Sequence, residues 1–210
     1  MFSLIVPVLY NFEGCTKLLA SVDEPFVPII VNNWHENRGV AGGWNYGITK
    51  SLEMGIDQFV IMNDDTYFEP GSRPSQLIKE LDETTGFVMG EVGFAYFATN
   101  KAALDKIGWF DENIYPGYFE DNDFAYRTKL ANLQYKGLIH SKVVHEGSKT
   151  QFWNGREEGK KTVSSAQFEA NRAYYIKKWG GGPGEEIFPV AFDGKEPEPK
   201  YHSPDYRREH

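Results

Sequence analysis

Three apolar runs stand out in the first third of the chain, at residues 3–8, 27–33 and 58–65. Each carries hydrophobic residues at nearly every position instead of alternating them with polar ones. Such runs are typical of strands that are buried on both faces of a sheet. The third run, QFVIMNDD, ends on two aspartates, and carboxylates avoid protein interiors unless something compensates their charge.

The segments between these runs have helical features. CTKLLASV, at residues 15–22, predicts a short helix. Further along, Trp44, Ile48 and Leu52 recur every four residues, and Gly55 stands where a helix would end. Strand, helix, strand, helix and strand at this spacing predict an α/β fold with a mainly parallel, Rossmann-like sheet flanked by helices. Ligands of such sheets bind beyond the carboxyl ends of the strands.

The second half of the chain continues the α/β pattern. Residues 74–83 predict a helix, 86–100 one or two strands, and 101–137 two helices that flank an aromatic loop. A last strand ends near His145, and a helix that contains residues 166–180 precedes a glycine-rich break. We expect one domain over residues 1–192. Prolines and charges dominate residues 193–210, which predicts an extended or disordered tail.

Composition places the chain among ordinary globular proteins, with 40% hydrophobic and 25% charged residues. The formal net charge of −8 makes extensive nucleic-acid binding unlikely, because phosphate contacts need lysine and arginine. Cys15 is the single cysteine, which favours a reducing compartment. The apolar start lacks a basic leader, and no apolar stretch is long enough to span a bilayer, so we expect a cytoplasmic protein.

The aspartates at the end of the third run are the first candidate chemistry. Asp64 and Asp65 would repel each other unless a cation or hydrogen-bond donors offset their charges, and Mg²⁺ and Mn²⁺ bind through such carboxylates. Asn32 and Asn33 end the second run, so they fall at the same edge of the predicted sheet. An aspartate-rich turn would explain the pair equally well.

Other polar groups are ambiguous when each is taken alone. FEDNDF, at residues 119–124, holds three acids in four positions, which is more than a helix cap requires, and a carboxylate there is a candidate general base. His145 could contact a metal or a diphosphate, and Lys149 and Arg156 could close over the same anion. All of these residues could equally be ordinary surface groups.

The stretch NRGVAGGWNYG, at residues 37–47, is a further candidate. Its glycines allow a close approach of the backbone to a ligand, and the exposed N–H groups at a helix start favour anions. It matches neither the dinucleotide-binding fingerprint nor the P-loop.

Taken together and in order, these motifs resemble the inverting family 2 glycosyltransferases of the GT-A fold, in particular their rhamnosyltransferase-like branch. The resemblance rests on IVPVLYN, ENRGVAGGWNYGI, NDDT followed by EPG, IGWFDENIYPGYFEDNDFAYR and VVHEGS, over residues 3 to 150 or so. Five motifs in sequence are far more specific than one. The resemblance implies transfer of a sugar from a nucleotide-diphosphate sugar to an acceptor hydroxyl, with Mn²⁺ or Mg²⁺ as cofactor.

The resemblance also implies roles for residues of this chain. Asp65, in the position of the D-x-D-like motif, would meet the metal together with His145. Asp121 would be the general base, with Glu120 beside it. The remaining positions would bind the nucleotide sugar: Pro7, Tyr10, Asn11, Asn32, Asn33, Arg38, Gly43, Asn45, Asn63 and Asp64. Trp109 and Tyr118 could stack on an acceptor sugar, although they could also pack the loop onto the core.

The chain departs from the family where the second run ends. Family members commonly carry an aspartate there to hold the nucleobase or ribose, whereas this chain has Asn32 and Asn33, which leaves the nucleobase open. The acceptor also stays open between a glycan, as in polysaccharide biosynthesis, a protein and a modified base. Two other functions compete: a protein that binds nucleotide sugar or glycan without turnover, and a sugar-phosphate nucleotidyltransferase.

Overall fold

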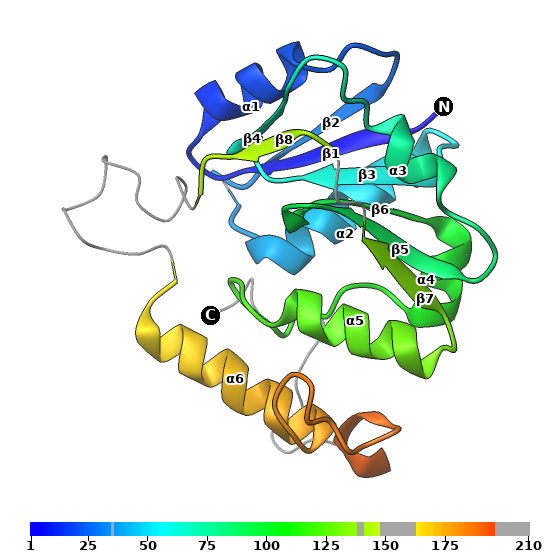
Figure 1. The fold of residues 1–210 in the computed structure, drawn as a ribbon. Helices are drawn as coiled ribbons and strands as arrows, with labels where there is room; N and C mark the ends of the chain where they lie inside the picture. Colours follow the sequence, from blue (N-terminus) through cyan, green and yellow to red (C-terminus); the bar gives the residue numbers. More distant parts are fainter. Residues whose placement is uncertain (35, 138–140, 148–162, 196–210) are drawn as a thin grey trace.

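The structure is a computed structural model of the 210-residue chain, and it describes residues 1–34, 36–137, 141–147 and 163–195. Its central sheet has six strands in the order β2-β1-β3-β6-β5-β7 (Figure 1). The strands are β1 (Ser3–Val8), β2 (Val27–Asn32), β3 (Gln58–Met62), β5 (Thr85–Gly90), β6 (Gly93–Asn100) and β7 (Gln134–Gly137). β6 runs antiparallel to both of its neighbours, and the other pairs are parallel. The predicted α/β fold with a mainly parallel sheet is confirmed.

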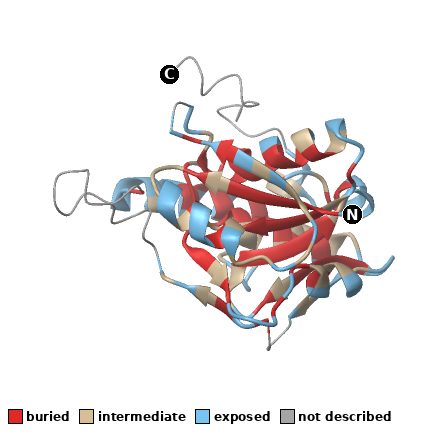
Figure 2. Cartoon of the chain, turned by 90° about the horizontal axis from the view of Figure 1, so that it is seen from above, coloured by how far each residue is buried: buried red, intermediate tan, exposed pale blue. Residues whose placement is uncertain are grey.

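Helices cover both faces of this sheet, so the strands lie at the centre of the molecule, as the buried residues of Figure 2 show. α1 (Phe12–Ala20) and α3 (Ser75–Lys79) pack on one face, where Leu4 and Val6 point. α2 (Gly39–Glu53), α4 (Lys101–Ile107) and α5 (Glu120–Leu130) pack on the other, where Ile5 points. This alternation along β1 is the period of a strand that is buried on both sides.

α6 (Ser165–Trp179) lies against α5 and not against the sheet (Figure 1). Its contact is an aromatic cluster that includes Phe119 and Tyr126 from the α5 side and Tyr175 and Trp179 from α6. A capping box at Ser164 starts the helix, and Gly180, with a φ of 77°, ends it. The helix predicted around residues 166–180 is therefore confirmed.

The expectation that the second run is a fully buried strand is wrong. β2 is an edge strand whose described hydrogen-bonding partner is β1, and only its alternate residues face a buried cluster. Val31 is buried, whereas the neighbouring Ile30 is 50% exposed. An apolar edge strand and a central strand have similar residue composition, so the sequence did not distinguish them.

Three short elements were not predicted. They are β4 (Thr66–Phe68), β7, and a 3₁₀ turn at Ala191–Gly194. The predicted helix at 74–83 shortens to Ser75–Lys79, because Asp82 accepts a hydrogen bond from the Thr84 backbone and starts a turn. Residues 196–210 of the predicted tail lie outside the described residues. Within the described part of the chain, no helix has the length and apolar character needed to cross a bilayer.

Candidate active site

A cavity of about 430 Å³ lies at the carboxyl ends of β1 and β3. This is the edge at which parallel α/β sheets bind ligands. Nine of the residues singled out from the sequence line it: Pro7, Asn33, Asn63, Asp64, Asp65, Tyr118, Glu120, Asp121 and His145. They come from β1, from the ends of β2, β3 and β8 (Val143–His145), and from the start of α5.

The acidic end of β3 is a tight turn between two strands. The backbone N–H of Asn63 donates a hydrogen bond to the carbonyl of Ala95 on β6. The carbonyl of Asn63 in turn accepts two hydrogen bonds, one from the N–H and one from the hydroxyl of Thr66. Asp64 and Asp65 lie between them and are each 4% exposed. The turn therefore holds two carboxylates in the wall of the cavity, as the sequence predicts.

His145 reaches the same turn through a two-stranded sheet. β8 (Val143–His145) pairs antiparallel with β4, and the register places His145 opposite Thr66. Nε2 of His145 lies 3.2 Å from Oδ1 of Asp65, and the N–H of Glu146 donates to the carbonyl of Asp65. The hydrogen bond that its imidazole donates to Asp65 raises the pKa of His145. A carboxylate and an imidazole from distant parts of the chain thus meet at one point.

The Asp65–His145 pair fits a divalent cation in donor type, because Mn²⁺ and Mg²⁺ take carboxylate oxygen and Mn²⁺ also takes imidazole. Among the described residues, no cluster of three or more histidine, cysteine, aspartate or glutamate side chains could hold a metal. A cation at this pair would therefore complete its coordination with substrate oxygens or water. That composition is usual where a diphosphate is part of the ligand.

The opposite wall of the cavity is the start of α5. Tyr118 and Phe119 have φ values of 71° and 81°, a conformation that non-glycine residues rarely adopt. The helix then begins with Glu120 and Asp121, and both line the cavity. Burial raises the pKa of Asp121, and one of its oxygens accepts the N–H of Asn122 at 2.8 Å.

Glu120 is buried more deeply than Asp121. It is 7% exposed, and its Oε2 has no hydrogen-bond partner among the described residues. Burial, and then the charge of Asp121, raise the pKa of Glu120 to about 8. Near neutral pH, Glu120 is therefore largely neutral.

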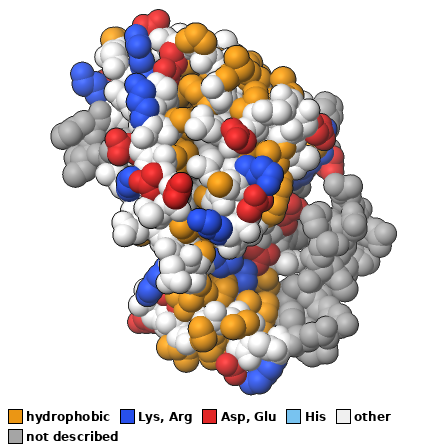
Figure 3. Space-filling model, turned by 90° about the vertical axis from the view of Figure 1, so that its right-hand side faces the viewer, with side chains coloured by type: hydrophobic (Ala, Val, Ile, Leu, Met, Phe, Trp, Pro, Cys, Tyr) orange, Lys and Arg blue, Asp and Glu red, His pale blue; other side chains and the backbone are white. Residues whose placement is uncertain are grey.

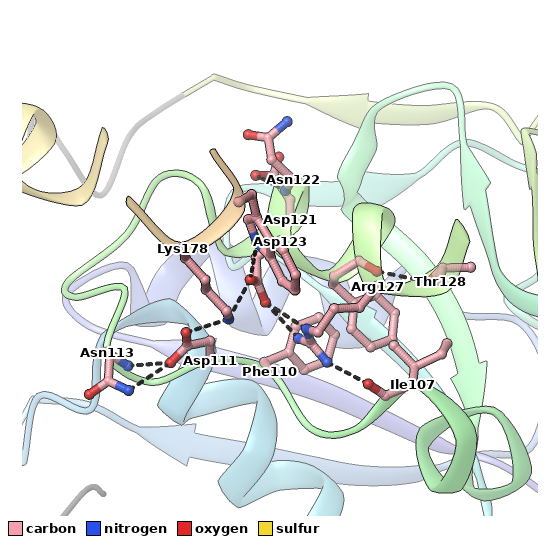
Figure 4. A network of polar contacts seen from close by, with 12 residues as sticks. Ile107, Phe110, Asp111, Asn113, Asp121, Asn122, Asp123, Arg127, Thr128 and Lys178 are labelled. Carbon is pink, nitrogen blue, oxygen red and sulfur yellow. Dashed lines mark hydrogen bonds and ion pairs between the residues drawn. The ribbon is translucent and has the colours of Figure 1, made fainter. Parts of the chain in front are cut away.

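The third acid of this helix, Asp123, has a structural part in the protein. It is fully buried and accepts hydrogen bonds from Arg127, Lys178 and Trp179 (Figure 4). Its charge is thereby neutralised inside the protein. Of the three acids in FEDNDF, Glu120 and Asp121 thus line the cavity, whereas Asp123 belongs to a buried network of ion pairs and hydrogen bonds.

Several predicted ligand residues are not part of the cavity wall. The side chain of Asn11 caps α1 at Gly14 and donates to the Asp64 carbonyl at 2.8 Å. Asn45 bonds the backbone of Phe110 in both directions, so it ties α2 to the loop after α4. Both amides position neighbouring backbone, and Asn11 thereby fixes the acidic turn itself.

The remaining predicted positions lie at the periphery or beneath the wall. Asn32 accepts the Trp34 N–H and is exposed, Tyr10 packs edge-on against Trp34, and Arg38 pairs with Glu36. Trp109 is 42% exposed and does not line the cavity.

Gly43 lies beneath the cavity wall. A Cβ on Gly43 would lie 3.1 Å from Asn33 and 3.2 Å from Pro7, so this glycine lets α2 approach β1. Lys149 and Arg156 lie outside the described residues.

The cavity also includes residues that the sequence did not mark as site residues. Trp44, read only as a core position of α2, lines it together with Phe94, and its Nε1 has no hydrogen-bond partner among the described residues. Asn37 and Val163, from the segments before α2 and α6, line it as well. A helical period marks Trp44 as buried but does not reveal that a cavity lies beside its ring.

Comparison with sequences gives limited information. No protein-family model matches the chain. A galactofuranosyl glycosyltransferase of Leishmania donovani is 35% identical over 74 residues, which are 34% of this chain. The chain spans 17% of the length of that curated relative.

Comparison with solved structures shows the fold. A β1,4-galactosyltransferase 7 of Drosophila, in complex with manganese, UDP-galactose and xylobiose, superposes with a TM-score of 0.57 at 15% identity, covering 81% of this chain and 79% of the other. TarS of Staphylococcus aureus in complex with UDP gives a TM-score of 0.51 at 11% identity, covering 88% of this chain and 73% of the other. The chain therefore has the GT-A fold of these glycosyltransferases, as the motifs predict.

Proposed function

We propose that this protein is a metal-dependent glycosyltransferase that moves a sugar from a nucleotide-diphosphate sugar to an acceptor hydroxyl. The observation that carries the proposal is the meeting of the Asp65–His145 pair with Glu120 and Asp121 in one cavity of a GT-A fold. Structural neighbours that hold UDP-galactose with manganese, or UDP, support this class of donor.

Asp65 and His145 would hold the divalent cation, either Mn²⁺ or Mg²⁺. When bound, the cation supplies Lewis-acid stabilisation of the negative charge on the leaving diphosphate. The chain alone offers a poor site for a diphosphate, because Asp64, Asp65 and Asp121 all line the cavity. Donor binding should therefore require the metal.

The nucleotide would lie along the ends of the first three strands. Pro7 and Asn33 line the β1–β2 end of the cavity, where a nucleobase could pack and form hydrogen bonds. Asn33 is 5% exposed, and its Oδ1 has no hydrogen-bond partner among the described residues. Asn63 and Asp64 would then face the ribose and the sugar.

Asp121 is the proposed general base. It lies in the wall opposite the strand ends, it is less buried than Glu120, and its elevated pKa makes it a stronger base than a free aspartate. One base that removes the acceptor proton as the hydroxyl attacks is sufficient for a single displacement, which would invert the anomeric centre. Tyr118, 39% exposed at the rim, is a candidate contact for the acceptor.

The base assignment predicts a specific kinetic defect. Asp121→Asn keeps the size of the side chain but removes its basicity, so turnover should fall by about 10²–10⁴-fold while donor affinity is largely kept. Hydrolysis of the nucleotide sugar and calorimetric titration of the nucleotide measure the two quantities. The matched control is Asp105→Asn, at an exposed position of α4. Near wild-type turnover in Asp121→Asn would refute the role.

The donor can be found with a panel of nucleotide sugars. Purified protein would be incubated with UDP-galactose, UDP-glucose, GDP-mannose and dTDP-rhamnose, each with Mn²⁺, with Mg²⁺ and with EDTA. Release of nucleoside diphosphate from one donor, dependent on the metal, is the expected result. Binding without release would favour a nucleotide-sugar-binding protein. Failure of every donor to bind would contradict the proposal. Four points stay predictions from the sequence. They are the choice of acceptor, membership of the rhamnosyltransferase-like branch, a part in polysaccharide biosynthesis and a cytoplasmic location.

A further inference from the structure

Residues 111–123 form the segment that brings the proposed base to the cavity. The segment begins shortly after α4, which ends at Ile107, and it runs into the first turn of α5. Five of its residues line the cavity: Pro116, Gly117, Tyr118, Glu120 and Asp121. The position of the base therefore depends on what holds this segment in place.

Lys178 on α6 binds both ends of this segment (Figure 4). Its Nζ lies 2.7 Å from Oδ2 of Asp111 and 2.5 Å from Oδ1 of Asp123. Lys178 is 7% exposed, so the two ion pairs are largely shielded from solvent. One ammonium group thus closes the segment into a loop at its base.

The middle of the segment is also held by α6. Nδ2 of Asn171 donates to the carbonyl of Gly117 at 2.8 Å, and Asn171 is 5% exposed. The ring of Phe168 packs against those of Tyr118 and Phe119, with centroids 5.3 and 5.2 Å away. Three positions of one helix, a turn or two apart, therefore contact the loop at its middle and at both ends.

The loop needs this support because its backbone conformation is unfavourable by itself. Tyr118 and Phe119 both have positive φ, and such residues persist only where surrounding contacts impose the conformation. Relaxation of either residue would rotate the chain just before Glu120 and Asp121. A displacement of about 1 Å at a reacting group is enough to reduce a rate by about 10²-fold.

We propose that Lys178 is a positioning residue that holds Asp121 at the reacting centre by joining Asp111 to Asp123. The inference rests on the proposed function, and it assigns to α6 a part in turnover. Lys178 does not line the cavity, so it would not contact a donor bound there. Its loss should therefore lower kcat and leave nucleotide affinity unchanged.

The test uses the full chain with the donor that the panel identifies. Lys178→Met removes the ammonium and keeps the aliphatic stem, and we expect kcat for donor hydrolysis to fall about 10²-fold. The nucleoside diphosphate should bind with a Kd within about threefold of wild type, because no ligand contact is removed. Lys177→Met, on the exposed side of the same turn, makes the same change of charge and should keep wild-type kcat.

A second variant separates positioning from folding. Lys178→Met leaves Asp111 without its cation, and this is expected to lower Tm, because an unpaired buried charge is costly. Asp111→Asn combined with Lys178→Met removes that charge, so Tm should recover while kcat stays low. Recovery of kcat together with Tm would overturn the proposal.

The remaining outcomes are also decisive. If wild type binds and hydrolyses a donor but Lys178→Met does so equally well, the positioning role fails and the proposed function stands. If wild type binds no nucleotide sugar, both fail. If neither Lys178 variant folds, Asn171→Ala, which removes the hydrogen bond to Gly117, takes their place, and wild-type kcat in that variant would refute the role of α6.

Discussion

At the scale of single residues, Glu120 is an unusual group in this protein. Glu120 is buried, and its Oε2 has no hydrogen-bond partner among the described residues, which favours the neutral form because a poorly compensated charge is costly in a medium of low polarity. Asp121, the next residue, adds repulsion against a second charge. Near neutral pH, Glu120 therefore adds little negative charge beside the proposed base.

This state of Glu120 makes stability depend on pH. Its pKa rises from an ordinary value of 4.5 to about 8 on folding, so the unfolded chain loses this proton first as the pH increases. The favourable contribution is complete below pH 4.5 and is lost as the pH rises through about 8. Glu120→Gln, which is neutral throughout, should thus gain stability over wild type as the pH rises.

We expect Glu120→Gln to be more stable than wild type by on the order of 3 kcal/mol at pH 9, and by much less at pH 5. Urea unfolding at the two pH values measures the difference. Glu83→Gln, at an exposed position, serves as the control and should show the same small difference at both. An equal effect of Glu120→Gln at pH 5 and pH 9 would show that Glu120 is charged in the folded protein.

At the scale of elements, the approach of α2 to β1 determines the shape of the cavity floor. A Cβ on Gly47 would lie 2.2 Å from Cγ2 of Ile5, far inside van der Waals contact. The helix can therefore rest on the strand only where it has no side chain. The same approach brings Gly43 against Pro7 and Asn33, which line the cavity.

Gly47→Ala should destabilise the protein by about 1–3 kcal/mol, since the strand must move to admit the methyl group. By helix propensity alone, alanine would instead stabilise the helix by about 1 kcal/mol relative to glycine. Gly42→Ala is the control in the same helix, because its nearest neighbours are side-chain atoms of Arg38 and Glu112. Denaturant midpoints compare the two, and equal values would contradict the packing described for Gly47.

The sequence predicted the elements whose burial is uniform. β1 and β3 are covered on both faces, so after the polar first residue of each strand their residues are apolar, and α2 shows the helical period in Trp44 and Ile48. β4 and β7, of three and four residues, are too short to carry a period, and their pairing partners are distant in the chain. Their existence depends on tertiary contacts that local patterns do not contain.

At the scale of the whole molecule, charge sets the conditions for ligand binding. The chain has a formal net charge of −8, and on the face shown in Figure 3 basic and acidic side chains are interspersed. The cavity wall holds four carboxyl groups, of which Glu120 is largely neutral near pH 7, and Asp64, Asp65 and Asp121 are the other three. An anionic nucleotide therefore needs a cation to bind there.

Metal and nucleotide should stabilise the protein jointly. A nucleotide at 100 times its Kd in the presence of Mn²⁺ contributes about 2.7 kcal/mol, which corresponds to a rise in Tm of about 5–10 °C for a chain of this length. EDTA should abolish the shift, and Asp65→Asn should reduce it. Thermal scans with nucleotide alone and with Mn²⁺ alone are the controls. A full shift in EDTA would show that the nucleotide binds without a metal.

The site was predictable as a set of motifs but not in its details. Asp65, His145 and Asp121 were singled out from motif resemblance, and the structure brings all three to one cavity. The separate tasks of Asp121 and Asp123, two residues apart, depend on Lys178, which lies far along the chain. Likewise, an asparagine such as Asn45 forms its hydrogen bonds with distant backbone, and a sequence gives no sign of that partner.

The short pairing of β4 with β8 separates the acidic turn's imidazole neighbour from the strands of the central sheet. Every described strand of the large sheet ends by Gly137, so a chain cut after that residue contains all of these strands and lacks His145. Asp65 precedes this cut, but its imidazole neighbour comes only with β8. A chain truncated before Val143 should therefore keep the strands of the central sheet and lack the histidine of the proposed cation site.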